Sequence, residues 1–281
     1  MVLDNAVTIP QYVTSTIPKH MNTRNSDAYT KSMIISIASQ KGGVGKTTTT
    51  ISVAAGLAHR GRRVLLIDTD SQANASKILI PDYSQIRRED SVYATIVQRQ
   101  ALPITQTSVQ NLDIVPAHIL LADTDIELST AKDHREARLK RELDKVKDGY
   151  DSILIDCPPN LGWLTLNALT AADAVVVVVA PGYFELDSIV QISKTIAEVH
   201  EYFNSELKLL GYLFARSTPT VNTKLALKIL RQTYTNQVLD TIIPENTDIR
   251  EALFNKKDIF MYSPDSKSAQ AYKRLIEELF S

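Results

Sequence analysis

Short apolar runs alternate along this chain with longer segments in which apolar residues recur every three or four positions. The runs have the length and the bounding charges that are typical of buried strands, and they cover residues 33–38, 64–67, 111–115, 153–155, 174–180 and 207–215. The segments with helical spacing cover residues 49–60, 91–97, 117–130, 134–147, 161–170, 187–203 and 266–280. Because strands and helices take turns, we expect an α/β fold, a doubly wound and mainly parallel sheet with helices on both faces.

The run 174–180 is the strongest strand signal, because it consists of valines between two flanking alanines. A strand without a polar face belongs where both sides of the sheet are covered, so we expect it at the sheet centre. Residues 1–32, by contrast, are polar and show no sustained period. We therefore divide the chain into an N-terminal extension, 1–32, expected to be flexible or packed on the surface, and one domain that covers 33–281.

Composition narrows the class of protein without adding a site. The chain has 281 residues, 44% of them hydrophobic and 22% charged, which is ordinary for a globular domain. Its net charge of -1 provides no overall attraction to nucleic acid, so any such binding needs a local basic face. The single cysteine, Cys157, permits neither a disulfide within the chain nor an iron–sulfur cluster. We expect it to be a buried apolar residue rather than a redox centre.

Two further observations concern membranes and export. No apolar run approaches the ~20 residues that are needed to span a bilayer. The N-terminus lacks the continuous apolar core of a secretory signal. Together with the lone cysteine, these features favour a cytoplasmic protein.

The segment 41–48 reads Lys-Gly-Gly-Val-Gly-Lys-Thr-Thr and lies between an expected strand and an expected helix. Strand, glycine-rich loop and helix form the context in which backbone N–H groups and a helix N-terminus bind phosphate. In that arrangement Lys46 would neutralise phosphate oxygens, and the Thr47 hydroxyl would bind Mg²⁺. The competing interpretation is a glycine-rich turn with a solvated lysine, which leaves the agreement of strand, loop and helix unexplained.

The loop departs from the common pattern, because Gln40 stands where the first glycine is usual and Lys41 follows it. This form resembles the deviant phosphate loop of the ParA/MinD family of P-loop ATPases. The resemblance implies ATP and Mg²⁺ as cofactors, and it implies that Lys41 reaches phosphates across a dimer interface and acts in catalysis together with Lys46. The ATP-binding residues that it implies in the loop are Lys41, Gly42, Gly43, Val44, Gly45, Lys46, Thr47 and Thr48.

Three aspartates follow expected strands, at the sheet edge where ligands bind in α/β proteins: Asp68, Asp70 and Asp156. The first two belong to Asp-Thr-Asp-Ser-Gln-Ala-Asn and the third to Asp-Cys-Pro-Pro, and both segments resemble the same family. The resemblance implies that Thr47, Asp68 and Asp156 lie near the metal and that Asp70 orients the attacking water. Solvated loop carboxylates are the alternative for Asp68 and Asp70.

Two later segments, 164–173 and 183–186, resemble the ParA branch of the family. The segment 240–246 resembles the part of the family that packs on adenine, and we assign Arg216, Pro244 and Asn246 to contact with the base on that resemblance. The alternative for this segment is a strand end with a proline stop.

ParA proteins bind DNA without sequence preference through exposed basic residues that neutralise phosphates. Part of the basic set in the C-terminal third recurs at helical spacing and therefore shares one face. The candidate DNA-contacting residues are Lys224, Lys228, Arg231, Arg250, Lys256 and Lys257. Glu245 and Asp248 stand where the family has arginine, so a solvated charged face remains the alternative.

As a whole, the resemblance implies a weak Mg²⁺-dependent ATPase that works as a switch. ATP would join two protomers, the dimer would bind nonspecific DNA of the nucleoid, and hydrolysis would release it. A ParB-like or adaptor protein would stimulate hydrolysis, and the cargo would be a plasmid, a chromosome origin or a protein assembly.

Two other functions stay open. One is a MinD-like regulator that cycles on a membrane, although we expect no stable membrane anchor, because the last turn of 266–280 carries Glu277 and Glu278 instead of a lysine cluster. The other is a metabolic enzyme that phosphorylates or amidates a small molecule.

Overall fold

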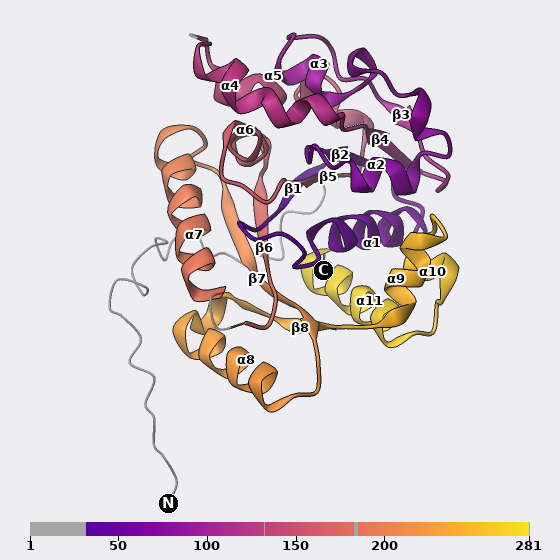
Figure 1. Cartoon of the computed structure of the whole chain (residues 1–281), viewed down its shortest axis with the longest axis vertical. Helices are drawn as coiled ribbons and strands as arrows, with labels where there is room; N and C mark the ends of the chain where they lie inside the picture. The colour runs from indigo at the N-terminus through magenta and orange to yellow at the C-terminus, as the bar shows by residue number, and fades with distance from the viewer. Residues whose placement is uncertain (1–31, 132, 183–184, 281) are drawn as a thin grey trace, which may run out of the picture.

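The computed structural model describes residues 32–131, 133–182 and 185–280 (Figure 1). Most of the predicted extension, 1–32, lies outside the described residues, so its flexibility stays a prediction. Tyr183 and Phe184, part of the 183–186 match, also lie outside them.

One eight-stranded sheet, in the order β3-β4-β2-β5-β1-β6-β7-β8, organises the described residues. All neighbouring strands are parallel except β3 and β4, which are antiparallel. The strands are β1 (Met33–Ala38), β2 (Val64–Asp68), β3 (Thr105–Gln106), β4 (Leu112–Val115), β5 (Ser152–Asp156), β6 (Ala174–Val179), β7 (Lys208–Ser217) and β8 (Val238–Pro244). The mainly parallel α/β fold predicted from the alternation of strands and helices is confirmed.

The central position predicted for 174–180 is confirmed as well. Strand β6 lies between β1 and β7, and all of its residues are buried. Strand β1 in turn lies between β5 and β6, so the chain moves to one side of β1 for β2, β4 and β5 and to the other side for β6, β7 and β8. In open α/β sheets, ligands bind at the carboxyl ends of strands where the strand order switches in this way.

Alternating residues of the strands face two separate cores. Ile35 and Ile37 of β1 belong to one core and Ile34 and Ala38 to the other. The first core is covered by α1 (Lys46–Ala58), α2 (Asn74–Leu79), α9 (Thr247–Phe254), α10 (Ile259–Tyr262) and α11 (Lys267–Phe280). The second core is covered by α3 (Val92–Ile96), α4 (Thr124–Ser129), α5 (Arg138–Leu143), α6 (Trp163–Ala171), α7 (Glu185–Tyr202) and α8 (Val221–Thr233).

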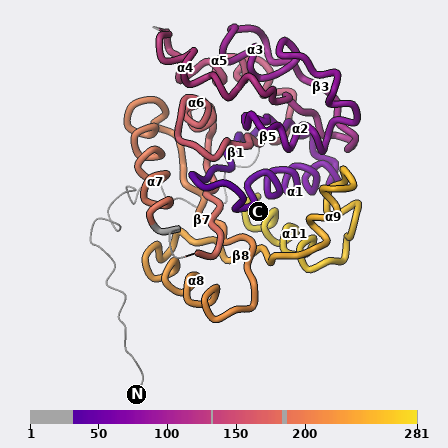
Figure 2. The backbone as a smooth tube through the Cα atoms, viewed as in Figure 1, coloured from indigo at the N-terminus to yellow at the C-terminus, as the bar shows by residue number. Residues whose placement is uncertain are grey.

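Segments far apart in sequence meet in the first of these layers. In the backbone trace, the C-terminal helices α9 and α11 lie beside α1, which directly follows β1 (Figure 2). Helix α11 packs its apolar stripe on the core, where Tyr272, Leu275 and Leu279 are buried. Glu278, from the same helix, accepts hydrogen bonds from the backbone of Asp240 and Thr241 on the edge strand β8. The apolar face of the final helix therefore covers the sheet.

Three predicted helices have different bounds in the structure. Helix α1 begins at Lys46 rather than at residue 49, because Gly45, with φ 102, forms its N-cap. The segment 134–147 is helical only over Arg138–Leu143, since 3₁₀ turns flank it at Arg135–Ala137 and Lys147–Gly149. The segment 117–130 begins with a 3₁₀ turn, Ile119–Asp123, before α4. No helix in the described part of the chain is long and apolar enough to cross a membrane.

Candidate functional site

The loop between β1 and α1 is held open by two glycines in left-handed conformation. Gly43 has φ 73 and Gly45 has φ 102, values that other residues adopt only with strain. Val44, between them, is 2% exposed and anchors the loop in the core. Within the described residues, the N-cap of α1 carries no side-chain cap, and its first turn carries no acidic residue. The unpaired N–H groups of this 13-residue helix are thus available to an anion.

Lys46 is a buried cation inside the loop. Its side chain is 6% exposed, and its ammonium donates a hydrogen bond of 3.0 Å to the backbone oxygen of Lys41. Burial lowers the pKa of this ammonium, while the negative charge of Asp156 acts in the opposite direction. A negatively charged phosphate group would stabilise the charged form of such a partly desolvated ammonium.

Two aspartates end neighbouring strands at this loop. Asp68 of β2 and Asp156 of β5 are register partners, and both are fully buried. Burial, followed by the nearby charge of Asp68, raises the pKa of Asp156 to about 8. Burial also raises the pKa of Asp68, to about 6, although hydrogen bonds from Ser76 oppose the shift.

The two carboxylates differ in their hydrogen bonds. Asp68 Oδ2 accepts from the backbone N–H and the hydroxyl of Ser76, at 2.9 and 2.7 Å, and its Oδ1 accepts from the backbone of Asp70. Asp156 Oδ1 accepts from the hydroxyl of Thr50, but Oδ2 is buried without a hydrogen-bond partner in the described part of the chain. An orphaned carboxylate oxygen of this kind is expected to have a ligand.

These carboxylates suit Mg²⁺, which also takes water and substrate phosphates as ligands, better than a metal ion that is held by protein side chains alone. Among the described residues, no group of three or more His, Cys, Asp or Glu side chains is arranged to hold a metal ion by itself. Mg²⁺ is typically held by one or two carboxylates and by substrate phosphates and water. Asp156 and the Thr47 hydroxyl at the start of α1 could supply the protein ligands. Asp68 instead accepts hydrogen bonds from Ser76 and from the backbone of Asp70, and so holds the loop that carries Asp70.

Asp70 lies in this loop with 8% of its surface exposed. Its Oδ1 accepts a hydrogen bond of 3.0 Å from the backbone of Gln72, and its backbone oxygen accepts one from Ala73. The carboxylate is therefore held in one orientation at the wall of a cavity.

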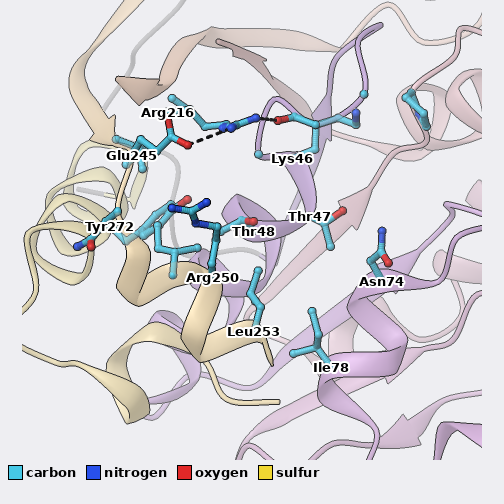
Figure 3. Close-up of a pocket in the computed structure, with 18 of the residues that line it drawn as sticks. Lys46, Thr47, Thr48, Asn74, Ile78, Arg216, Glu245, Arg250, Leu253 and Tyr272 are labelled. Carbon is cyan, nitrogen blue, oxygen red and sulfur yellow. Dashed lines mark hydrogen bonds and ion pairs between the residues drawn. The ribbon is translucent and has the colours of Figure 1, made fainter. Parts of the chain in front are cut away.

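This cavity has a volume of about 660 Å³, within the range of small-molecule sites (Figure 3). It joins the phosphate loop to the ends of β7 and β8 and to helices α2, α9 and α11. The predicted nucleotide-site residues that line it are Gly42, Gly43, Gly45, Lys46, Thr47, Thr48, Asp70, Arg216, Pro244 and Asn246. Arg250, which the sequence assigned to DNA contact, lines it as well. Of the other predicted nucleotide-site residues, Val44 is buried in the core, and Lys41 has an exposed side chain next to the loop.

The side of the cavity predicted to contact a base combines β7, β8 and α9. Arg216 and Pro244 end the two strands, and Asn246 caps α9 by accepting a hydrogen bond of 3.0 Å from the backbone of Asp248. The amide group of Asn246 also donates to the Asp248 carboxylate.

Sequence reasoning missed several lining residues. They are Gln72, Asn74, Ile78, Ala215, Ile243, Glu245, Ile249, Leu253 and Tyr272. Pro159, from the Asp-Cys-Pro-Pro segment that the resemblance had singled out, lines the cavity as well. The spacing of 246, 249, 250 and 253 is helical and could have indicated one face of α9 directed at the site. No comparable signal pointed to Tyr272, because α11 reaches the cavity only through tertiary packing.

The candidate DNA-contacting residues fall into two groups. Lys224, Lys228 and Arg231 are exposed along α8, as their spacing predicted. Arg250 lies on α9, and Lys256 and Lys257 follow that helix. Figure 1 shows α8 and α9 well apart, so the two groups form separate patches.

Comparison with known proteins identifies related chains. The model of a family described as AAA domain matches residues 32–209. The sporulation initiation inhibitor protein Soj of Bacillus subtilis is 41% identical over 249 residues, covering 88% of this chain and 97% of its own. The chromosome partitioning protein ParA of Myxococcus xanthus is 36% identical over 271 residues, covering 92% of this chain and 95% of its own.

Solved structures agree with these relatives. A cobyrinic acid a,c-diamide synthase from Mycobacterium smegmatis, with bound ADP and magnesium, is 33% identical with a TM-score of 0.75, covering 88% of this chain and 94% of its own. The septum site-determining protein MinD of Pyrococcus horikoshii, complexed with Mg-ADP, is 27% identical with a TM-score of 0.70, covering 88% and 96%.

Proposed function

Because the chain belongs to the ParA/Soj family of chromosome-partitioning ATPases, we propose that it binds ATP and Mg²⁺ beside α1 and hydrolyses ATP slowly. One observation carries the proposal. The buried Lys46 ammonium lies at an open helix N-terminus and lines a cavity with room for a base. The negative charge of the buried Asp156, whose Oδ2 has no partner among the described residues, acts on this ammonium.

In this proposal each group has a separate task. The N–H groups of 43–47 and the Lys46 ammonium bind the β- and γ-phosphates, and Pro244 and Asn246 contact the base. Thr47 and Asp156 hold Mg²⁺, directly or through water, and Asp68 orients the adjoining loop. The bound metal supplies charge neutralisation on the phosphate oxygens.

Asp70 orients the water that attacks the γ-phosphate, because its carboxylate is fixed at the cavity wall. Among the described residues, no histidine lines the cavity, and Lys46, which does, binds the phosphates in this proposal, so the site lacks a strong general base and turnover is slow without help. A ParB-like or adaptor protein would accelerate it.

The switch depends on a second copy of the chain. Lys41 of one protomer approaches the phosphates of the other and stabilises the charge that develops during phosphoryl transfer. The ATP-bound dimer binds nonspecific DNA through α8 and the 250–257 patch and so associates with the nucleoid. Hydrolysis removes the contacts of the γ-phosphate and releases both the dimer and the DNA.

The test is the binding of nonspecific duplex DNA with ATP, with ADP and without nucleotide, over a series of salt concentrations. We expect binding with ATP only and an affinity that falls steeply with salt, because phosphate contacts release counterions. Lys46→Ala serves as the nucleotide-free control. Equal DNA binding under all three conditions would refute the switch.

The MinD-like alternative has one observation in its favour, the likeness to the Pyrococcus horikoshii protein. Against it, the apolar stripe of α11 is buried and Glu278 is bonded to β8. Pelleting with anionic liposomes and ATP, combined with no DNA binding, would reverse this ranking.

The name of the Mycobacterium smegmatis neighbour, a diamide synthase, suggests a further alternative, an enzyme that amidates a small molecule. A thiolate that takes nitrogen from glutamine must be ionised and accessible. Cys157, the single cysteine, is 1% exposed, and burial raises the pKa of its thiol well above the usual value. This favours the partition ATPase over a glutamine-dependent enzyme.

A further inference from the structure

One guanidinium group joins three segments at the rim of the cavity. Arg216, near the end of β7, donates a hydrogen bond of 2.6 Å from Nη1 to the backbone oxygen of Gly43. Its Nη2 donates to the Glu245 carboxylate at 3.1 Å (Figure 3). The phosphate loop is thereby tied to the connection between β8 and α9.

The backbone of Arg216 is strained in order to place this side chain. Its φ is 55, in the left-handed region, where a long side chain is disfavoured by about 1 kcal/mol or more. The pairing of β7 with β8 shifts register between Phe214 and Ser217, around the same residue. Strain at a cavity wall indicates a residue that is retained for its contacts rather than for its conformation.

Glu245 is itself held in place. Its backbone N–H donates a hydrogen bond of 2.9 Å to Ser217, which ties β8 to β7, and the next residue, Asn246, caps α9. The carboxylate of Glu245 therefore gives the Arg216 guanidinium a fixed partner on the wall opposite the phosphate loop.

The hydrogen bond to Gly43 has a consequence for the loop. All described peptide bonds are trans, so the carbonyl of Gly43 and the N–H of Val44 point in opposite directions. Because the carbonyl points at Arg216, the N–H of Val44 points away from it. Val44 is buried, so the peptide unit is fixed from both ends.

We propose that Arg216 is a positioning residue for the phosphate loop, with Glu245 as its anchor. It holds the Gly43–Val44 peptide in the orientation in which the loop presents N–H groups to a polyphosphate. This inference rests on the proposed ATP site and deepens it. The role differs from the base contact that the family resemblance implies for Arg216.

Calorimetric titration with tripolyphosphate, with adenosine and with ATP separates the two roles. In Arg216→Gly, which suits the left-handed backbone, we expect affinity for tripolyphosphate and for ATP to fall about tenfold or more, because a charge-assisted hydrogen bond is lost. Adenosine affinity stays unchanged. Arg216→Lys recovers part of the loss, since one ammonium cannot reproduce the fork, and Glu245→Gln loses less than Arg216→Gly.

Two controls accompany these variants. Arg88→Ala removes an ion pair of similar exposure, Arg88–Glu89, that lies outside the cavity lining, and should leave all three affinities unchanged. Thermal unfolding without nucleotide shows whether Arg216→Gly is folded, and we expect no loss of stability, because glycine removes the backbone strain.

The outcomes discriminate clearly. A loss for adenosine and ATP but not for tripolyphosphate would assign Arg216 to the base and overturn the proposal, as would unchanged affinities in Arg216→Gly. If the wild-type chain binds neither ATP nor tripolyphosphate, the proposed function fails and the role of Arg216 falls with it.

Discussion

Asp68 and Asp156 occupy matching positions at the ends of adjacent strands, yet their hydrogen bonds separate their tasks. Asp68 is saturated by Ser76 and by the backbone of Asp70, whereas Asp156 keeps one buried oxygen without a partner in the described chain. At the residue scale, the local bonds thus assign loop support to Asp68 and leave Asp156 with an oxygen available for the proposed metal. Ser76 extends the support, because its hydroxyl also accepts from the backbone of Ala117.

Asp70→Ala should retain ATP binding and lose hydrolysis, because the carboxylate lies at the cavity wall and takes no part in the phosphate loop. The ATP-bound dimer would then persist. Phosphate release and nucleotide affinity, measured on the same preparation, check this expectation. Normal hydrolysis in the variant would remove Asp70 from the water-orienting role.

At the scale of elements, α1 is the point where the site and the fold share contacts. Its N-terminus faces the cavity, while its later turns pack on α10 and α11. Gly56 allows this close approach, because a Cβ there would lie 2.4 Å from Ile276 and 2.8 Å from Phe260. The C-terminal helices therefore stabilise the helix whose N-terminus forms the proposed phosphate site.

Gly56→Ala should destabilise the fold by about 1–3 kcal/mol, despite the better helix propensity of alanine, because the packed layer must shift. Gly149→Ala is the matched control, since a Cβ there meets no atom within 4 Å. Urea unfolding of both variants measures the difference. Equal midpoints would show that α11 shifts to accommodate the added methyl group without a loss of stability.

A titratable contact links the end of α1 to α10. His59 Nε2 lies 3.2 Å from the buried carboxylate of Asp258, which also caps α10. The hydrogen bond to Asp258 raises the pKa of His59 above 6.5. A raised folded-state pKa adds stability that is complete below the unfolded pKa and is lost as pH rises through the folded value.

The stability difference between wild type and His59→Ala should therefore be larger at about pH 5.5 than at about pH 8. Urea midpoints at the two pH values measure it. Asp258→Asn keeps a capping side chain but removes the carboxylate charge that His59 faces. The stability of this variant should therefore depend less on pH than that of the wild type. A difference that does not change with pH would contradict the assignment.

At the scale of the whole molecule, one sheet gathers residues from widely separated segments at its carboxyl edge. Lys46, Asp70, Arg216 and Arg250 line one cavity, although Lys46, Asp70 and Arg250 follow β1, β2 and β8, and Arg216 lies near the end of β7. Lys41, by contrast, is exposed beside the loop, and its backbone oxygen accepts a hydrogen bond from the Lys46 ammonium. This arrangement suits a side chain whose proposed target belongs to a second copy.

Lys41→Ala should weaken ATP-dependent dimerisation while the monomer still binds ATP, because the backbone contact to Lys46 survives the substitution. Sedimentation with a non-hydrolysable ATP analogue measures the dimer, and calorimetry measures nucleotide affinity. An unchanged dimer would reduce Lys41 to a surface charge.

The sequence alone determined the α/β class, the central position of 174–180 and the glycine-rich loop between strand and helix, because these depend on local periodicity and on glycines at fixed spacing. It also placed Asp68, Asp70 and Asp156 at the ends of strands, since parallel strands end at the same edge. The bounds of 134–147 were wrong, because 3₁₀ turns flank the short helix there.

Only the tertiary structure decided which groups share the cavity and how each is bonded. Contacts between residues distant in sequence pair Arg216 with Glu245 and place Tyr272 in the cavity lining. Tertiary packing likewise separates α8 from α9. Periodicity and spacing carry no information about such contacts. They arise when the two apolar layers close on the sheet and bring the strand ends and helices together.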